Sequence, residues 1–321
     1  MKSTSSFSAL FAVAAFQCAS AAPAVVDTSL PTYKPAVSLS GSLRSIGSDT
    51  LDKLMHAWSA KFTEFHPGIR FNLEGKGSAT APPALTEGDA QFAPMSREMW
   101  KSEAEAFEKK HGYKPVAIPV AIDALAVFVH KDNPIKGLTL KQLDGIFSTE
   151  RKRGGANITN WDQLGVAHQW QGRKIVVYGR NTISGTHGFF SEHALLRGTL
   201  KGTVKQQSGS QEVVSHVAGD LFGIGYSGIG YTTSGVKALP LGEKEGHLWK
   251  PTQQNCMLGN YPLTRHLFIY VNKKPGQQVD AATFEFLKFA LSKDGQDIVS
   301  ETGFFPLGKA GVELGLNALT K

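Results

Sequence analysis

The stretch from Val176 to Phe190, VVYGRNTISGTHGFF, combines the residue types that bind a small anion. Its apolar start predicts a short buried strand, and Ser184, Gly185 and Thr186 open a predicted helix. A helix start leaves backbone N–H groups without partners and carries roughly half a positive charge. Arg180 adds a planar guanidinium that matches two oxygens of a tetrahedral anion. The stretch therefore predicts an oxyanion site, unless Ser184 only caps the helix and Arg180 only makes a surface ion pair.

Three other positions place hydroxyl groups where a strand gives way to a helix. Thr50 and Leu51 begin a run of apolar residues at helical spacing. Ser78 follows a predicted strand over residues 69–73, and Ser96 ends a third segment of this kind. Open α/β sheets bind ligands at the carboxyl ends of their strands, so these hydroxyls are predicted to lie at a ligand-binding edge.

Two carboxylates lie close to these turns. Asp123 interrupts two apolar runs, residues 116–120 and 124–129, which predict two strands covered on both faces. A carboxylate between buried strands needs a partner or a function. Asp49 precedes Thr50, and we expect it to cap the helix that follows.

The N-terminus predicts export. Residues 7–21 form an apolar run that ends in small residues, and the run is too short to span a bilayer. We therefore expect residues 1–21 to be a cleaved signal peptide and residues 22–42 to be a leader. Cleavage leaves Cys256 as the one cysteine of the mature chain, where it is expected to be a small buried hydrophobic residue.

Composition excludes several classes of partner. The formal net charge of +7 favours anionic ligands, but no basic run is interleaved with stacking aromatics, so we expect no nucleic-acid partner. The ten histidines contain no H-x-x-x-H pair, and we expect no metal and no cofactor. A G-x-G-x-x-G spacing occurs at Gly223, Gly225 and Gly228, but no helix is predicted after it, which argues against a dinucleotide site. His187, next to Thr186, has the chemistry of a base for a Ser or Thr nucleophile, but its place on the first turn of a predicted helix favours a solvent-facing side chain.

Nine short motifs in order resemble the phosphate-binding proteins of bacterial phosphate ABC transporters, the PstS family. They are GSDT, GKGSAT, FAPMSRE, VAIDALAVFVHKDNP, LTLKQLDGIFS, ITNWDQLG, RNTISGT, FGIGYSGIGY and GFFPL, and they cover residues 43–307. The resemblance implies the α/β fold of a type II periplasmic-binding protein: two lobes, each with a mixed central sheet, joined by two crossing strands as a hinge. On that model, lobe 1 comprises residues 43–120 plus 263–321, and lobe 2 comprises residues 121–262.

The resemblance also implies a site and a function. The ligand-binding residues would be Thr50, Leu51 through its N–H, Ser78, Ser96, Arg180, Ser184, Gly185 and Thr186. The protein would be a monomeric periplasmic carrier, not an enzyme, that captures inorganic phosphate between its lobes and delivers it to an ABC permease in the inner membrane. The alternatives are a binder of another tetrahedral oxyanion, such as sulfate, molybdate or a phosphonate, and a secreted phosphatase.

Two departures from the family pattern bear on which anion is preferred. Arg97 stands where some members carry an Asp after the Ser of the third turn, and that Asp accepts a hydrogen bond from protonated phosphate. Sulfate carries no proton at neutral pH and cannot donate this hydrogen bond, so such an acceptor favours phosphate over sulfate. Asp123 and Asp49 are the remaining candidates for a proton acceptor. Thr182 stands where some relatives have an Asp beside the Arg, which predicts a less encumbered Arg180 and a more positive pocket.

Overall fold

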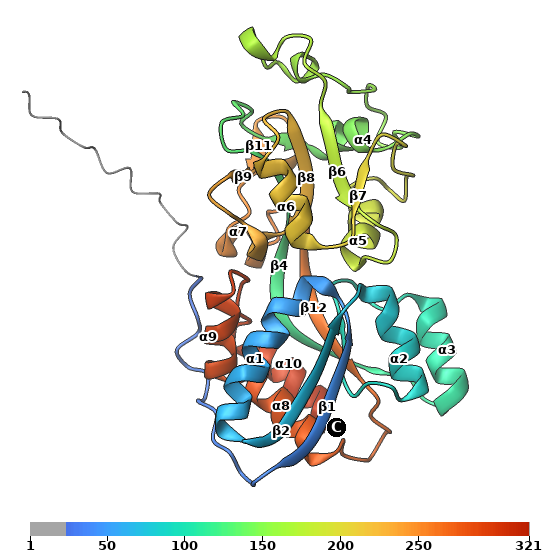
Figure 1. Ribbon diagram of the computed structural model, residues 1–321, viewed down its shortest axis with the longest axis vertical. Coiled ribbons are helices and arrows are strands. Elements are labelled where there is room, and N and C mark those ends of the chain that lie inside the picture. Colours follow the sequence, from blue (N-terminus) through green and yellow to red (C-terminus); the bar gives the residue numbers. More distant parts are fainter. Residues whose placement is uncertain (1–23, 321) are drawn as a thin grey trace, which may run out of the picture.

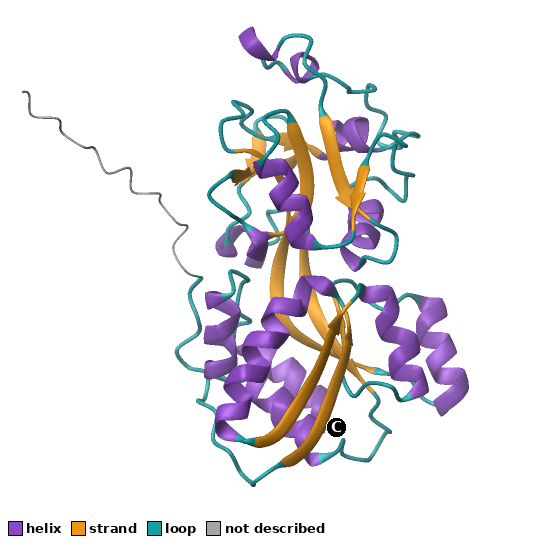
Figure 2. Ribbon diagram, in the orientation of Figure 1, coloured by secondary structure: helices purple, strands orange, loops and turns teal. Residues whose placement is uncertain are grey.

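Two long strands, β4 (Val116–His130) and β12 (Thr264–Val271), run side by side through the middle of the molecule (Figure 1). They pair antiparallel, and elements gather at both ends of the pair into two α/β lobes (Figure 2). The computed structural model describes residues 24–320, so the predicted signal peptide lies outside the described residues. Within them, no helix is both long and apolar enough to cross a membrane. The predicted fold class, two α/β lobes linked by crossing strands, is confirmed.

The lower lobe in Figure 1, called lobe 1 here, contains a parallel strand pair and a short strand that extends the crossing strands. Strands β1 (Ser40–Gly47) and β2 (Gly68–Gly75) run parallel, and a parallel bridge from Ser45 to Phe92 joins β1 to the segment before β3 (Ala93–Met95). Strand β3 pairs antiparallel with β12. The helices of this lobe are α1 (Asp52–Phe65), α2 (Ala81–Glu87), α3 (Lys101–His111), α8 (Ala281–Ala290), α9 (Lys293–Glu301) and α10 (Lys309–Thr320).

The upper lobe, lobe 2, continues the same sheet from the other half of β4. Strand β4 pairs antiparallel with β8 (Gly223–Gly228) and β9 (Val236–Ala238), while β6 (Val176–Arg180) lies parallel between β8 and β7 (Lys205–Gln207). A small sheet contains β5 (Leu138–Thr139), β10 (Leu241–Lys244) and β11 (His247–Trp249). The helices are α4 (Leu140–Phe147), α5 (Gly185–His193), α6 (Ser210–Ala218) and α7 (Gln253–Met257).

Aromatic packing holds the helices that carry the candidate site. In lobe 1, Phe62 on α1 packs edge-on against Phe286 on α8, with ring centroids 5.4 Å apart. In lobe 2, Phe190 on α5 stacks on Tyr226 of β8 at 3.9 Å, and Phe147 on α4 meets Phe190 edge-on at 5.0 Å. Because the start of α5 carries Ser184 to Thr186, this stack fixes that turn relative to the sheet.

Two local expectations were wrong. Residues 116–130 form one continuous strand instead of two strands broken at Asp123, because a cation on the facing strand pairs with that carboxylate. The cap at the start of the first helix is Ser48, whose hydroxyl accepts the N–H of Thr50 at 3.2 Å. Asp49 does not cap the helix, since its side chain is used in a contact between the lobes.

Candidate anion-binding site

Hydroxyl groups from three turns meet between the lobes. Thr50 lies in the 3₁₀ turn η1 (Asp49–Leu51), Ser78 in η2 (Ser78–Thr80), and Thr186 in the first turn of α5, and all three are 0% exposed. The Oγ1 atoms of Thr50 and Thr186 lie 2.9 Å apart, which makes a direct hydrogen bond between lobe 1 and lobe 2. The Oγ of Ser78 lies 3.3 Å from that of Ser96 and accepts the Ser96 N–H at 3.1 Å. The structure therefore brings four of the predicted hydroxyls into one buried cluster.

Gly185 allows the start of α5 to lie against this cluster. A Cβ atom at Gly185 would collide with Ser78 Oγ and would lie 2.7 Å from Ser96 Oγ. Real Cβ atoms essentially never approach another atom this closely, so any side chain here would push α5 away from lobe 1. Gly185 is thus required for the close approach of the two lobes.

Ser184 caps α5, as one reading of the sequence expected. Its Oγ accepts the N–H groups of Thr186 and His187 at 3.1 and 3.4 Å, and its own N–H donates to Asn181. A hydroxyl that accepts at its lone pairs can still donate its hydrogen, so capping and anion binding are compatible. The N–H of Leu51, another predicted ligand, points to the carbonyl of Ser48 at 3.3 Å.

Arg180 is fully buried and reaches across to lobe 1. Its Nη2 donates to Asp49 Oδ1 and to the carbonyl of Ser208, both at 2.7 Å, and its Nη1 donates to Ser210 Oγ at 2.8 Å. The other oxygen of Asp49 accepts the Ser210 N–H at 3.0 Å and the Ser210 hydroxyl at 2.8 Å. The expectation of a less encumbered Arg180 was therefore wrong. With Thr182 in place of an Asp, Asp49 supplies the carboxylate from the opposite lobe.

Asp123 also has a buried partner, Arg265, which the sequence analysis did not single out. The Nε and Nη2 of Arg265 donate to Asp123 Oδ2 at 3.0 and 2.7 Å, and the N–H of Ile229 donates to Oδ1 at 3.0 Å. Burial raises the pKa of the Asp123 carboxyl, and the Arg265 guanidinium opposes that shift. The signal in the sequence is one arginine near the start of the largely apolar segment of residues 263–271.

Arg97 is balanced within its own lobe. Its guanidinium makes two hydrogen bonds with Glu103, at 2.8 and 2.7 Å, and lies 3.6 Å from the centre of the Trp100 ring. The arginine that replaces the family Asp is therefore part of a bidentate ion pair under an aromatic ring. It removes one carboxylate from the third turn without adding an unpaired cation to the site.

His187 and Thr186 are not arranged as a catalytic base and its nucleophile. The Nδ1 of His187 lies 3.4 Å from the Tyr226 hydroxyl, and burial together with the charge of Arg180 lowers the pKa of His187. Thr186 Oγ1 is bonded to Thr50 and Arg265 instead. Across residues 24–320, no group of three or more His, Cys, Asp or Glu residues could hold a metal ion.

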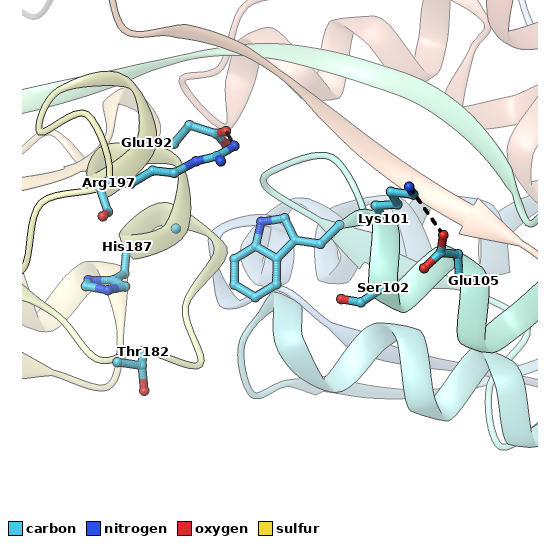
Figure 3. Close-up of a pocket in the computed structure, with 10 residues that line it drawn as sticks. Lys101, Ser102, Glu105, Thr182, His187, Glu192 and Arg197 are labelled. Atoms are coloured by element: carbon cyan, nitrogen blue, oxygen red, sulfur yellow. Dashed lines mark hydrogen bonds and ion pairs between the residues drawn. The ribbon is translucent and has the colours of Figure 1, made fainter.

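A groove of about 730 Å³ marks the outer seam between the lobes, where α3 faces α5 (Figure 3). Its cations are paired: Arg197 with Glu192, and Lys101 with Glu105 at 3.6 Å. The positive charge at this seam is thus balanced nearby. The lining residues are Trp100, Lys101, Ser102, Glu105, Thr182, His187, Gly188, Ser191, Glu192 and Arg197.

Comparison with known proteins identifies the family. A family model described as a PBP superfamily domain matches residues 25–294. The phosphate-binding protein PstS of Pseudomonas aeruginosa is 47% identical over 323 residues, which cover 98% of this chain and 100% of that protein. The chain belongs to the PstS family. The family resemblance expected from the nine motifs is thereby confirmed, and the protein SphX of Synechococcus elongatus, 30% identical over 88% of this chain and 83% of its own length, is a more distant relative.

Solved structures with the same fold include phosphate-transport proteins. A phosphate ABC transporter substrate-binding protein from Clostridium perfringens, with bound phosphate, superposes with a TM-score of 0.71 at 26% identity, over 83% of this chain and 100% of that one. An ABC-type phosphate transport receptor from Vibrio cholerae gives a TM-score of 0.65 at 28% identity, again over 83% of this chain and 100% of that one. This PstS-family chain therefore shares the architecture of phosphate-transport proteins.

Proposed function

We propose that this protein captures inorganic phosphate between its lobes and delivers it to an ABC permease. The observation that carries the proposal is the buried cluster of the Thr50, Ser78 and Thr186 hydroxyls from both lobes. The guanidinium of Arg265 contacts this cluster, and that of Arg180 pairs with Asp49, the residue before Thr50. The relatives support it, since they include a phosphate-binding protein and a solved structure with bound phosphate.

In this proposal, phosphate is bound by groups on both lobes. The ligands are the side chains or N–H groups of Thr50, Leu51, Ser78, Ser96, Arg180, Ser184, Gly185 and Thr186. A charge-assisted hydrogen bond contributes about 1.5 to 3 kcal/mol, so several together offset the cost of desolvating and immobilising the anion. Since neither lobe carries all of them, the anion stabilises the closed arrangement. The lobe boundaries at residues 120/121 and 262/263 remain part of this proposal.

The inner cluster is close to electrically neutral by itself. Arg180 pairs with Asp49 and Arg265 pairs with Asp123, so two buried cations face two buried carboxylates. The charge of phosphate would therefore be held by hydrogen-bond donors and helix starts, and not by an excess of cations. Such a site selects by geometry and by the proton on the ligand. Asp123 and Asp49 remain the candidate proton acceptors.

We propose that the protein is a periplasmic monomer without catalytic activity, exported by the apolar segment of residues 7–21. The absence of an assembled nucleophile and base at His187 and Thr186 supports a carrier over a phosphatase. The alternative ligands are sulfate, molybdate and phosphonates.

Calorimetry at neutral pH tests the proposal. Phosphate should bind with a stoichiometry of one, more tightly than sulfate, molybdate or a phosphonate, and a phosphomonoester should not be turned over. Tighter binding of sulfate, or product release that is lost in His187→Ala, would contradict it.

A further inference from the structure

A second buried guanidinium lies among the hydroxyls of the site. Arg265 Nη2 donates to Thr186 Oγ1 of lobe 2 at 3.0 Å, and its Nη1 donates to the carbonyl of Ser96 in lobe 1 at 2.9 Å. Because Arg265 lies on the crossing strand β12, its guanidinium bridges predicted ligand residues of both lobes. Its side chain is 2% exposed.

The two buried arginines have different surroundings. The guanidinium of Arg180 contacts Asp49, Ser208, Ser210 and the carbonyl of Gln207. None of these belongs to the predicted hydroxyl ligands. Between these two cations, Arg265 is the one whose hydrogen bonds reach the hydroxyl cluster directly.

The orientation of Arg265 is fixed by the sheet. In the antiparallel register of β4 and β12, Arg265 is the direct partner of Asp123. Asp123 in turn lies against the cluster, because a Cβ at Gly228 would be 3.0 Å from Asp123 Oδ2 and 3.3 Å from Thr50 Cγ2. The paired carboxylate and backbone therefore hold the guanidinium in one place before any ligand arrives.

The contact with Arg265 also affects the hydroxyl hydrogen of Thr186. Since Arg265 donates to Thr186 Oγ1, that oxygen accepts with one lone pair and keeps its own hydrogen for donation to Thr50 Oγ1 or to a ligand. A hydroxyl that accepts from a cation is a stronger donor, since hydrogen bonds in a chain polarise one another. A guanidinium has five N–H groups, and four of its hydrogen bonds in the described residues go to Asp123, Thr186 and Ser96. The remaining Nη1 hydrogen lies on the nitrogen that bonds Ser96.

We propose that Arg265 is an anion-contacting residue of this site, donating an N–H to a phosphate oxygen and strengthening Thr186 as a donor. The inference rests on the proposed function, because it adds a cation to the same site. Two arginines would then bind the tetrahedral oxyanion: Arg180 on β6 and Arg265 on β12.

The test compares variants of Arg265 by phosphate calorimetry and by thermal unfolding without ligand. Arg265→Lys keeps the charge and the pair with Asp123 but loses the planar fork, and the double variant Asp123→Asn/Arg265→Gln avoids a lone buried charge. Arg44→Gln, which removes an arginine paired with Glu74 away from the cluster, is the matched control.

Both Arg265 variants should bind phosphate at least tenfold more weakly, whereas the control should match the wild type. The ligand-free melting temperature of Arg265→Lys should stay within a few degrees of the wild type, since its ion pair persists. If the wild type binds phosphate, and if both Arg265→Lys and the double variant bind it as tightly as the wild type does, this inference is overturned and the proposed function stands. If the wild type itself binds no phosphate, the proposed function fails.

Discussion

Replacing Gly185 by Ala should weaken closure of the lobes around phosphate without lowering the stability of either lobe. The added Cβ would collide with Ser78 Oγ and lie 2.7 Å from Ser96 Oγ, so α5 must retreat from lobe 1 by several tenths of an ångström or more. Gly185 is the first residue of α5, where Ala is favoured over Gly by up to about 1 kcal/mol in helix propensity. The clash lies between the lobes and is relieved when they open, so in the ligand-free protein each lobe should remain as stable as before, or slightly more stable.

Phosphate binding should respond in the opposite direction. A retreat of this size weakens the hydrogen bonds that one lobe adds to an anion held by the other. The loss of one or two bonds of about 1.5 kcal/mol each raises Kd by about tenfold to a hundredfold. Calorimetry with phosphate and ligand-free thermal unfolding measure the two effects. Gly188→Ala on the same helix is the control, because the atoms nearest to its Cβ belong to the side chains of Arg97 and Trp100 and are 3.2 Å or more away. Unchanged phosphate affinity in Gly185→Ala would refute the reasoning that the bound state needs this close approach.

Three further substitutions test individual groups. Arg180→Ala should weaken phosphate binding about tenfold or more, through loss of at least one charge-assisted bond, and unchanged calorimetric affinity would remove Arg180 from the site. Asp123→Asn should lower the ratio of phosphate to sulfate affinity if Asp123 accepts the phosphate proton; an unchanged ratio would leave Asp49 or no acceptor. The folded state holds the pKa of His187 below its unfolded value near 6.5, so the stability due to neutral His187 is present above that pH and is lost as the pH falls towards the folded-state pKa. His187→Gln should therefore lose less thermal stability than the wild type between pH 7.5 and 5, and equal losses would contradict this assignment.

The turns of the site could be predicted from sequence because their signals are local. A short apolar strand followed by Ser, Gly and Thr marks a strand end and a helix start within about ten residues. The strand expected at Val176–Tyr178 is present as β6, and the helix start at Ser184 is capped as one reading expected. The family resemblance grouped Thr50, Ser78 and Thr186, and the structure places Thr50 against Thr186 and Ser78 against Gly185.

The ion pairs could not be predicted because their partners are distant in the chain. Asp49 and Arg180 are 131 residues apart, and Asp123 and Arg265 are 142 apart. The second pair depends on the register of two crossing strands, which no local pattern specifies. For this reason Asp123 was expected to interrupt a strand, and Arg265 was overlooked within an apolar run.

The last helix also depends on contacts that a local pattern does not show. Residues Lys309–Thr320 contain Gly311 and Gly315, which lower intrinsic helix propensity. In the fold, Gly315 lets α10 approach the core, since a Cβ there would lie 2.9 Å from Leu291 and 3.4 Å from Ile118. Tertiary packing therefore stabilises a helix that its own sequence only weakly favours.

A crystal structure of the protein with phosphate tests the central claim most directly. The account predicts a single tetrahedral ion between the lobes, with oxygens within about 3.2 Å of hydroxyls from Thr50, Ser78 and Thr186 at once. An ion bound elsewhere, or bound to the residues of one lobe alone, would contradict it.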